Sequence, residues 1–571
     1  MCKIFLSILL LLLTICHSIQ AADELFRGGH SVYSIILTNN ASLSERTAAK
    51  ELQTIIKDIS GATLPISNHS VNKGIYIGWT AHTGVPKPTA TDESFTYKTA
   101  DGNLYIYGGS ERGTMYGVYC FLERELGVHW YTSTFTKIPK RDHYILPRLF
   151  HSEKPAIKKR LDFLYDALHH NEWAAHNLLN TQHQYSQTPY GPMSSFWGIH
   201  TFQTLMPPAV YFNEHPEYYS VYKGQRSDNS QLCLSNEQMR HELTKNLLDT
   251  IAKNPGYWCY DVSQNDNPHP CECAACQRLE KVYGGHSGAI IWFVNQVARD
   301  VKRFYPHIYI GTFAYSYTRQ APKSNIRPDD NVVIRLCDIE CCMAHPLEDC
   351  PQNRSFLTDM NDWRRKAKNI YIWDYTTGFL NYLLPFPNFE VLADNFRYFS
   401  QSNVIGILEE GAHDAPWNEF SELKQWLIAK LMWNPNQDVD SLATLFINDY
   451  YGTAAPYIKQ YYDLCQEQVT ADTHFTIKID GKSNLYDDTF IASGEQLMEE
   501  AITATEDYPE ENKRVLRVAA QIYYLKLISN MEESISDGTL QQLESIIKKD
   551  YTIIAEHGIS LEKMLKDHTY K

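Results

Sequence analysis

Short apolar runs alternate with stretches of helical period between Ala156 and Asn434, and this alternation constrains the fold more than any other feature of the 571-residue chain. Strands that alternate with helices are typical of a parallel sheet with helical crossovers. The strand-like runs are Leu161–Tyr165, Trp258–Val262, Ile308–Phe313, Val332–Leu336, Ile370–Trp373 and Val404–Leu408. Although eight strands cannot be counted, the length predicts an α/β fold with a (β/α)8-like barrel over residues 151–433.

A small α/β domain is predicted before the barrel, over residues 23–150. Ser42 and Glu45 have the spacing of a capping box, and the amphipathic helix that they open ends at Gly61. The other expected elements are two strands and a second helix, at Gly74–Gly78, Leu104–Tyr107 and within Gly108–Tyr131. This segment therefore carries both kinds of element and is long enough for a core of its own.

A helical domain is predicted after the barrel, over residues 434–571. Strand-like runs cease from Phe420 onwards, and apolar residues recur at helical period. The helical segments are Ser441–Gln468, Ser493–Thr505, Asn512–Met531 and Leu540–His557. The chain is thus expected to hold three domains, which its length also favours.

Residues 1–22 have the features of a signal peptide. Lys3 supplies a positive charge, Ile4–Leu13 is an apolar core too short to cross a bilayer, and Ala21 and Ala22 suit a cleavage site. Cys16 weakly resembles a lipoprotein acceptor, but the bulky Ile15 before it favours simple export. We expect an exported protein with no membrane span.

Composition bears on the kind of partner. The net charge is −15 and there is no basic cluster, which excludes nucleic acid because phosphate binding needs a basic face. Aromatic residues make up 13% of the chain. They suit stacking on sugar rings, although a large core explains them equally well.

Polar residues follow the strand-like run that ends at Val262. Ser263 and Gln264 come first, then Asn265 and Asp266, and prolines from Pro268 onwards turn the chain into a loop. Barrel enzymes carry their catalytic groups at the carboxyl ends of strands, so Asn265 and Asp266 are candidate catalytic residues. The alternative is a plain turn, since Asn and Asp before proline favour turns in any protein.

Two carboxylates end another strand-like run, at Glu409 and Glu410. Side chains alternate along a strand, so only one of the two can face the mouth of a barrel, and the sequence does not show which. Two strand ends that carry acids are typical of a glycoside hydrolase, in which a carboxylic acid protonates the leaving oxygen. Glu409 and Glu410 are therefore also candidate catalytic residues.

Other strand ends offer candidates for contact with a substrate. Asp338 and Glu340 follow one run and Asp374 follows another, where they would contact a ligand or brace the site. Aromatic and histidine side chains nearby are candidates for a sugar-binding floor, with ordinary packing as the alternative: Trp197, His200, Tyr315, Trp373 and Tyr375.

Cysteines gather in two short segments. Cys271, Cys273 and Cys276, near His269, have spacings that suit a structural zinc ion, which the second segment with Cys341, Cys342, His345 and Cys350 would complete. Disulfides between the segments or from Cys342 to Cys350, and free thiols, stay open as alternatives. No HExxH spacing occurs, so we expect no catalytic zinc and no cofactor.

Several motifs together resemble a known group. They are Trp197–Phe202 (WGIHTF), His215–Arg226 (HPEYYSVYKGQR), Gln231–Leu234 (QLCL), the run SQND with the following cysteines, Cys342–Leu347 (CMAHPL) and the EEG at Glu409–Gly411. Over about Asp23–Gln468 the chain resembles a large group of secreted bacterial proteins first defined as a domain of unknown function. That group includes the family 163 glycoside hydrolases, endo-beta-N-acetylglucosaminidases that act on N-glycans.

The pattern Gly108–Tyr131 resembles the non-catalytic N-terminal domain that precedes the barrel in alpha-glucuronidases and beta-hexosaminidases. This resemblance implies that Arg112 and Glu123 are surface residues. Together the resemblances imply a glycan substrate and a place in the periplasm or at the cell surface of a bacterium.

The resemblance also implies a mechanism. Retaining hydrolysis of N-acetylhexosaminides often uses the acetamido oxygen of the substrate as nucleophile, with one residue to orient the acetamide and one acid. We assign these roles to Asn265 and Asp266; the competing assignment gives the acid to Glu409 or Glu410 and leaves Asp266 as the orienting group. Alternative functions are an alpha-glucuronidase-like enzyme, which needs basic residues in its pocket, and a non-catalytic glycan-binding protein.

Overall fold

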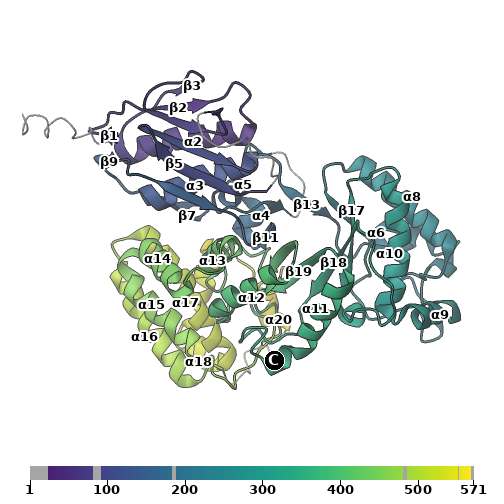
Figure 1. Ribbon diagram of the computed structural model, residues 1–571. Coiled ribbons are helices and arrows are strands. Elements are labelled where there is room, and N and C mark those ends of the chain that lie inside the picture. The colour runs from purple at the N-terminus through teal and green to yellow at the C-terminus, as the bar shows by residue number, and fades with distance from the viewer. Residues whose placement is uncertain (1–22, 82–91, 183–187, 480–484, 551, 568–571) are drawn as a thin grey trace, which may run out of the picture. The chain divides into compact units, whose positions relative to one another are not determined.

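The computed structural model describes residues 23–81, 92–182, 188–479, 485–550 and 552–567, so the expected signal peptide lies outside the described residues. Contacts divide the chain into two compact units (Figure 1). The first holds the described residues up to Trp130 together with Thr136–Pro155 and Thr188–Gly191. The second holds the described residues of three stretches, 131–135, 156–182 and from Pro192 onwards.

The described part of the first unit holds a main sheet, a small two-stranded sheet of β1 (Glu24–Arg27) and β9 (His143–Ile145), and helices α2 and α3 (Glu111–Leu126). The six strands of the main sheet lie in the order β10 (Phe150–Glu153), β5 (Phe95–Ala100), β6 (Asn103–Gly108), β4 (Gly74–Ile77), β2 (Ser34–Leu37) and β3 (Ile66–Ser67). Helix α2 (Leu43–Ser60) begins with the predicted capping box of Ser42 and Glu45 and ends at Gly61, whose φ of 82° is the left-handed conformation that glycine adopts easily.

Helix α3 (Glu111–Leu126) corrects the interpretation of Arg112 as a surface residue. Arg112 is only 5% exposed. Its guanidinium donates to the hydroxyl of Tyr116 and to the carbonyl of Tyr190, and lies 3.6 Å from the carboxylate of Glu93. These partners compensate the buried charge, and through them Arg112 connects the helix to other segments of its unit. Helical periodicity does not reveal such a role.

The second unit contains the barrel, and the predicted fold class is confirmed. Eight parallel strands form one sheet in the order β11 (Lys159–Phe163), β20 (Gly406–Glu410), β19 (Ile370–Tyr375), β18 (Val332–Cys337), β17 (Tyr309–Ala314), β16 (Cys259–Asp261), β13 (Ser194–Trp197) and β12 (Thr181–Gln182). Six of them lie at predicted runs. The very short β12 and β13 carry too little apolar sequence for a periodicity to reveal them.

The barrel is nearly closed, and a side chain bridges its seam. Asn180 stands just before β12, opposite the edge strand β11. Its side-chain oxygen accepts from the N–H of Arg160 at 2.9 Å, and its amide donates to the carbonyl of Lys158 at 2.7 Å. The side-chain amide thus supplies the pairing that a strand ladder supplies elsewhere.

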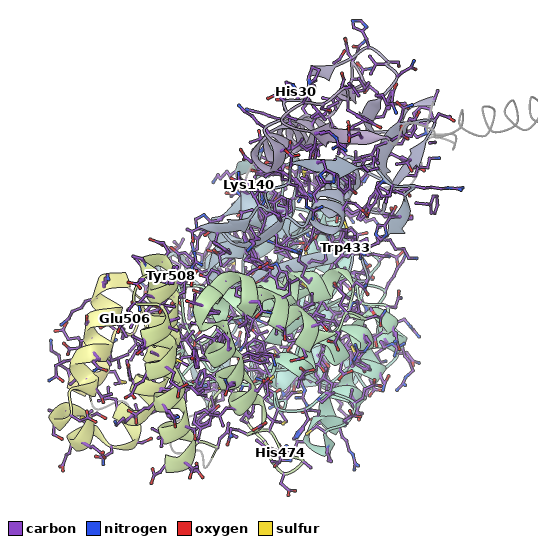
Figure 2. The ribbon with its side chains drawn as sticks, turned by 90° about the vertical axis from the view of Figure 1, so that its left-hand side faces the viewer. His30, Lys140, Trp433, His474, Glu506 and Tyr508 are labelled. Carbon is purple, nitrogen blue, oxygen red and sulfur yellow. The ribbon has the colours of Figure 1, made fainter. Side chains whose placement is uncertain are left out.

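Helices follow most strands of the barrel. They include α8 (Glu237–Lys253), α9 (Ala274–Tyr283), α10 (His286–Lys302), α11 (Arg354–Lys366), α12 (Phe389–Gln401) and α13 (Ser421–Trp433). Every residue of α13 is buried, because the helix contacts β11 and the following helix α14 (Val439–Tyr451). Its last residue, Trp433, is labelled in Figure 2. A helix enclosed in this way needs no polar face.

The C-terminal segment is helical, as its periodicity predicts. Its main helices are α14 (Val439–Tyr451), α15 (Ala455–Gln466), α16 (Asp488–Ala504), α17 (Pro509–Ser529), α18 (Met531–Ser536), α19 (Thr539–Asp550) and α20 (Leu561–Asp567). Glu506 and Tyr508 mark the turn between α16 and α17 (Figure 2). None of the described helices has both the length and the apolar character needed to cross a membrane.

Candidate active site

A cavity of about 500 Å³ opens at the carboxyl ends of the barrel strands. This is the end at which barrel enzymes bind substrate. The cavity is walled by aromatic rings and contains both carboxyl and basic groups: Phe163, Phe313, Tyr315, Trp373, Tyr375 and Phe379; Asp266, Glu410 and Glu556; His200, His413 and Lys478. An apolar wall with a few charged groups is typical of a small-molecule site.

Glu410 is the last residue of β20, and its side chain lines the cavity. The indole N–H of Trp373 donates to its carboxylate at 2.7 Å. Burial raises the pKa of Glu410 to about 7; the hydrogen bond from Trp373 opposes this rise, and the carboxylates of Glu556 and Asp266 add to it. A carboxyl group with this pKa is protonated in a large fraction of molecules at neutral pH and can serve as a general acid.

Asp266 also lines the cavity, from the loop after β16. The hydroxyl of Tyr315 donates to its carboxylate at 3.1 Å. Burial, followed by the charge of Asp266, raises the pKa of Tyr315, so the phenol remains a donor at neutral pH. The carboxylate of Asp266 is thus held in place by a neutral donor and can accept a further hydrogen bond.

Asn265 does not line the cavity, although it precedes Asp266. Its side-chain oxygen accepts from the N–H of Gln203 at 3.1 Å, and its amide donates to the carbonyl of Ser230 at 2.7 Å. Its own N–H donates to the side chain of Gln231 at 2.8 Å. Both ends of the Asn265 side chain are therefore used to fasten the loop that carries Asp266.

Glu409 lies on the opposite face of β20 from Glu410, within a row of buried carboxyl groups. The strand register places Glu409 beside Asp162 of β11 and Asp374 of β19, and Asp338 follows the end of β18 one strand further on. These four side chains are between 0 and 2% exposed. Among the described residues, neither oxygen of Glu409 has a hydrogen-bond partner.

Burial is the main cause of high pKa values throughout this row. It raises the pKa of Asp162, Asp338 and Glu409 well above the usual range, and neighbouring carboxyl groups add to the effect. Burial also raises the pKa of Asp374, to about 6. Asp338 and Asp374, expected to contact a ligand or brace the site, stand in this row and do not line the cavity.

Four of the five residues expected in the sugar-binding floor do line the cavity, namely His200, Tyr315, Trp373 and Tyr375. Trp197 does not; its ring stacks on Tyr260 with centroids 6.1 Å apart. Glu340 is likewise outside the cavity and pairs with Arg319 at 2.7 Å.

A buried ion pair lies in the barrel interior. Arg335 of β18 pairs with Asp261 of β16, and both are at most 2% exposed. The guanidinium lies over the ring of Phe313 at 4.4 Å and near that of Trp373 at 5.7 Å. Because both rings also line the cavity, the ion pair supports the cavity floor.

Sequence reasoning missed several lining residues. Phe163 is the last residue of β11 and lies on the same face of the strand as Leu161, so strand alternation could have identified it. Its ring contacts that of His413, with centroids 4.9 Å apart. Lys478 and Glu556 come from the helical segment far beyond the last strand. No local pattern marks them, since only the packing of that segment brings them to the barrel mouth.

The two cysteine segments do not join. Cys271, Cys273 and Cys276 gather around Cys233, without His269, whereas Cys342, His345 and Cys350 gather around His474. Cys341 belongs to neither group. No disulfide is formed among the cysteines of the described residues, and the two segments are not linked through a shared metal-ligand group.

Comparison with known proteins supports the fold. The model of a family described as a domain of unknown function, DUF4838, matches residues 130–463. No curated protein matches the sequence.

Two solved structures share the fold of this chain. A family 115 4-O-methyl-alpha-glucuronidase with specificity for decorated arabinogalactans is similar over 92% of this chain and 76% of its own, with a TM-score of 0.60 and 13% identity. A family 89 glycoside hydrolase from Clostridium perfringens, solved with 2-acetamido-1,2-dideoxynojirimycin, is similar over 90% and 65%, with a TM-score of 0.53 and 10% identity. At such identities the likeness is one of fold.

Proposed function

This chain belongs to the DUF4838 family, and we propose that it is an exported retaining glycoside hydrolase. Its proposed substrates are N-glycans, whose beta-N-acetylglucosamine linkages it cleaves with the help of the substrate's own acetamido group. The motif resemblance to family 163 supports this choice of linkage. The signal-peptide pattern of residues 1–22 supports action in the periplasm or at the cell surface.

The observation that carries the proposal is the pair of carboxyl groups in one aromatic cavity, Glu410 with its pKa raised to about 7 and Asp266 held by Tyr315. In the first step Glu410 donates its proton to the leaving glycosidic oxygen as that bond to C1 breaks. The acetamido oxygen attacks C1 from the other side, and Asp266 accepts a hydrogen bond from the acetamide N–H to hold it in line.

In the second step Glu410, now a carboxylate, takes a proton from water. The water oxygen bonds to C1, and the bond from C1 to the acetamido oxygen breaks, which restores the acetamide and the original configuration. One carboxyl thus serves as acid and then as base. Of the two assignments that the sequence left open, this geometry favours Glu410 as the acid and Asp266 as the orienting group, because Asn265 is turned away from the cavity.

A second candidate is an alpha-glucuronidase-like enzyme. It is favoured by Lys478, a basic side chain in the cavity that could pair with a uronate. Besides the acid Glu410, two carboxyl groups line the same cavity, Asp266 and Glu556, and negative charge on them opposes a uronate, so the neutral N-acetyl sugar fits better.

The test is a product screen of the purified full chain against a panel of N-glycans and a panel of glucuronoxylans. We expect released glycan fragments from the first panel only, and none from Glu410→Gln, whereas the matched Glu409→Gln variant keeps its activity. Uronic acid released from the second panel would establish the second candidate. Retention of glycans without any product would identify a glycan-binding protein instead.

A further inference from the structure

Four cysteines converge near the loop that carries Asp266. The sulfur atoms of Cys233, Cys271, Cys273 and Cys276 all lie within 4.8 Å of one another. The Sγ of Cys233 is 3.8 Å from that of Cys273 and 3.7 Å from that of Cys276. A disulfide would need about 2.05 Å. A tetrahedral zinc ion with bonds of about 2.3 Å to sulfur holds its sulfur atoms about 3.8 Å apart, which matches.

The backbone around this group suits thiolates. Cys273 is the N-cap of α9, and its sulfur accepts from the N–H of Cys276 at 3.4 Å. The sulfur of Cys271 accepts from the N–H of Val221, also at 3.4 Å. Such N–H donors stabilise metal-bound thiolates and orient them, as does the positive end of a helix.

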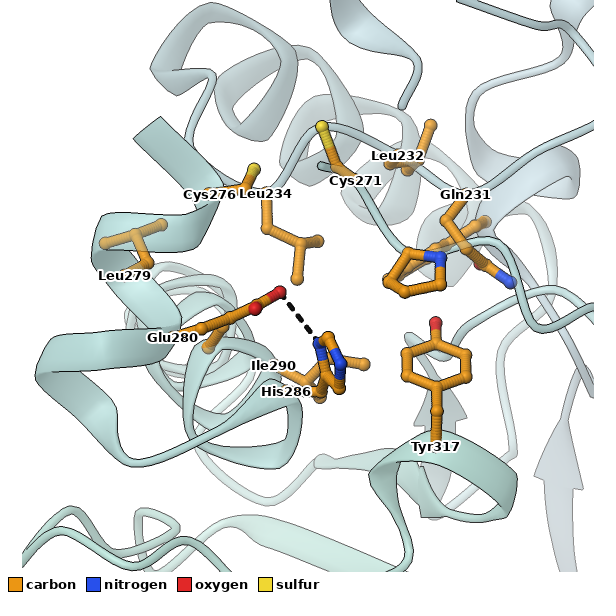
Figure 3. A pocket seen from close by; sticks show the side chains of 13 residues that line it. Gln231, Leu232, Leu234, Cys271, Cys276, Leu279, Glu280, His286, Ile290 and Tyr317 are labelled. Atoms are coloured by element: carbon orange, nitrogen blue, oxygen red, sulfur yellow. Dashed lines mark hydrogen bonds and ion pairs between the residues drawn. The ribbon is translucent and has the colours of Figure 1, made fainter. Parts of the chain in front are cut away.

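The nearby imidazole is engaged elsewhere. Figure 3 shows Cys271 and Cys276 at the edge of a small pocket in which His286 and Glu280 face each other. The Nδ1 of His286 lies 2.7 Å from that carboxylate. The ligand set is therefore four thiols, three of them buried.

We propose that Cys233, Cys271, Cys273 and Cys276 bind a structural zinc ion. Four sulfur ligands leave no open position, so the ion has no place for a substrate or a reactive water. Its effect is to fasten the loop between β16 and α9, in which Asp266 lies, to the segment around Cys233. Cys233 stands far from the other three in sequence, which is why their short spacing did not reveal it.

A second group supports a second zinc ion independently. Cys342, His345, Cys350 and His474 offer ligand atoms within 4.8 Å of one another. The Nδ1 of His474 is 3.3 Å from the sulfur of Cys342 and 3.7 Å from that of Cys350. A tetrahedral zinc ion sets sulfur and nitrogen ligands roughly 3.5 Å apart.

A hydrogen bond orients the ring of His345 toward the other ligands. Its Nε2 lies 3.0 Å from the carbonyl of Thr470, to which it donates, so that Nδ1 is left free as a metal ligand. His474 lies in the same stretch of chain as Thr470, at the exposed edge of the molecule (Figure 2). The geometry points to a Cys2His2 zinc site that joins the loop after β18 to this stretch.

The second site bears on the cavity wall. The N–H of Met343 donates to the carbonyl of Phe475 at 2.8 Å, so the two segments already meet beside the ligands. Ile477 and Lys478, which follow directly, line the cavity. Both zinc ions therefore hold segments that shape the cavity, one from the barrel loops and one from the C-terminal segment.

The test measures metal and thiols on the purified full chain, desalted, with no metal added. We expect two zinc ions per chain by plasma mass spectrometry, released when a mercurial reagent titrates the thiols. Cys233→Ser and His474→Ala should each leave one ion. Cys341→Ser is the matched control, because this buried cysteine adjoins Cys342 yet lies outside both groups, and it should keep two.

Other results would overturn the inference. A metal-free protein in which all cluster thiols titrate would make them free cysteines, and missing thiols without metal would make them disulfides. Iron in place of zinc would refute the identity of the ion. If a variant does not fold, the mercurial release from the unaltered chain still decides. This measurement does not depend on activity. An inactive protein with two zinc ions would therefore contradict the proposed function and leave the zinc sites supported.

Discussion

The two faces of β20 place neighbouring glutamates in opposite surroundings. Glu410 lies in the cavity, where an indole N–H binds it and its pKa is raised to about 7. Glu409 lies in the row with Asp162, Asp338 and Asp374, fully buried and without a donor among the described residues. Burial raises the pKa on both faces, but of the two only Glu410 lines the cavity.

This comparison teaches that a raised pKa alone does not mark a catalytic group. Within the row, burial and neighbouring carboxyl groups raise the pKa values of Asp338 and Glu409 well above the usual range, because neither carboxyl has a hydrogen-bond donor among the described residues to stabilise its ionised form. Access to the cavity is what separates Glu410 from Glu409. The predictions below test this separation.

The largest expected effect comes from Glu410→Gln. Loss of the general acid should lower kcat about 10³-fold on glycosides with poor leaving groups, and much less on activated aryl glycosides. Glu409→Gln should leave kcat within about threefold on both, since it touches no substrate. Steady-state kinetics on matched leaving groups provide the measurement. Equal losses at the two positions would break the comparison.

A smaller loss is expected from Asp266→Asn. A carboxylate has two acceptor oxygens, one for the hydroxyl of Tyr315 and one for the acetamide N–H, whereas an amide side chain has only one. The acetamide is then held less well, so kcat should fall about 10²-fold whatever the leaving group. Asn265→Ala should instead affect stability. It leaves the N–H of Gln203 and the carbonyl of Ser230 without their hydrogen-bond partner, which lowers the free energy of unfolding by about 1–3 kcal/mol. Denaturant unfolding and kinetics together separate the two. A leaving-group-selective loss at Asp266 would return the acid's role to that residue.

The buried row should show itself in the dependence of stability on pH. Its folded pKa values are raised, so the folded state holds more protons, and stability falls as pH rises from about 4 toward the folded values, near 6 for Asp374. Glu409→Gln removes one such group, so its stability relative to the unaltered chain should be higher at pH 7 than at pH 5. Thermal unfolding at both pH values measures this, and a difference that shrinks with pH would contradict it.

The smallest effect concerns the pH above which Glu410 loses its proton and activity declines. Glu410 must be protonated to act, so activity should decline as pH rises through about 7. Trp373→Phe removes the N–H that stabilises the carboxylate, and should move this decline upward by roughly one pH unit. A pH profile of kcat is sufficient. A shift to lower pH, or none, would mean that another group controls the decline.

Much of the fold could be predicted from the sequence. The strand-like runs ending at Val262 and Leu408 and the helical periods after Asn434 depend on local alternation, which short-range physics sets. The capping box at Ser42 is equally local. By contrast, β12 has two residues and gains its place only from its neighbours, through contacts such as those of Asn180.

By itself, therefore, the sequence determined which strands end in polar residues, and with them the set of candidates that includes Asp266, Glu409 and Glu410. Only the tertiary structure decided that Glu410 faces the cavity, that Asn265 turns away, and that Lys478, Glu556, Cys233 and His474 join groups far from them in the chain. The physical reason is range: side-chain alternation is a property of one strand, whereas burial, pKa and ligand geometry depend on segments that meet only when the chain is packed.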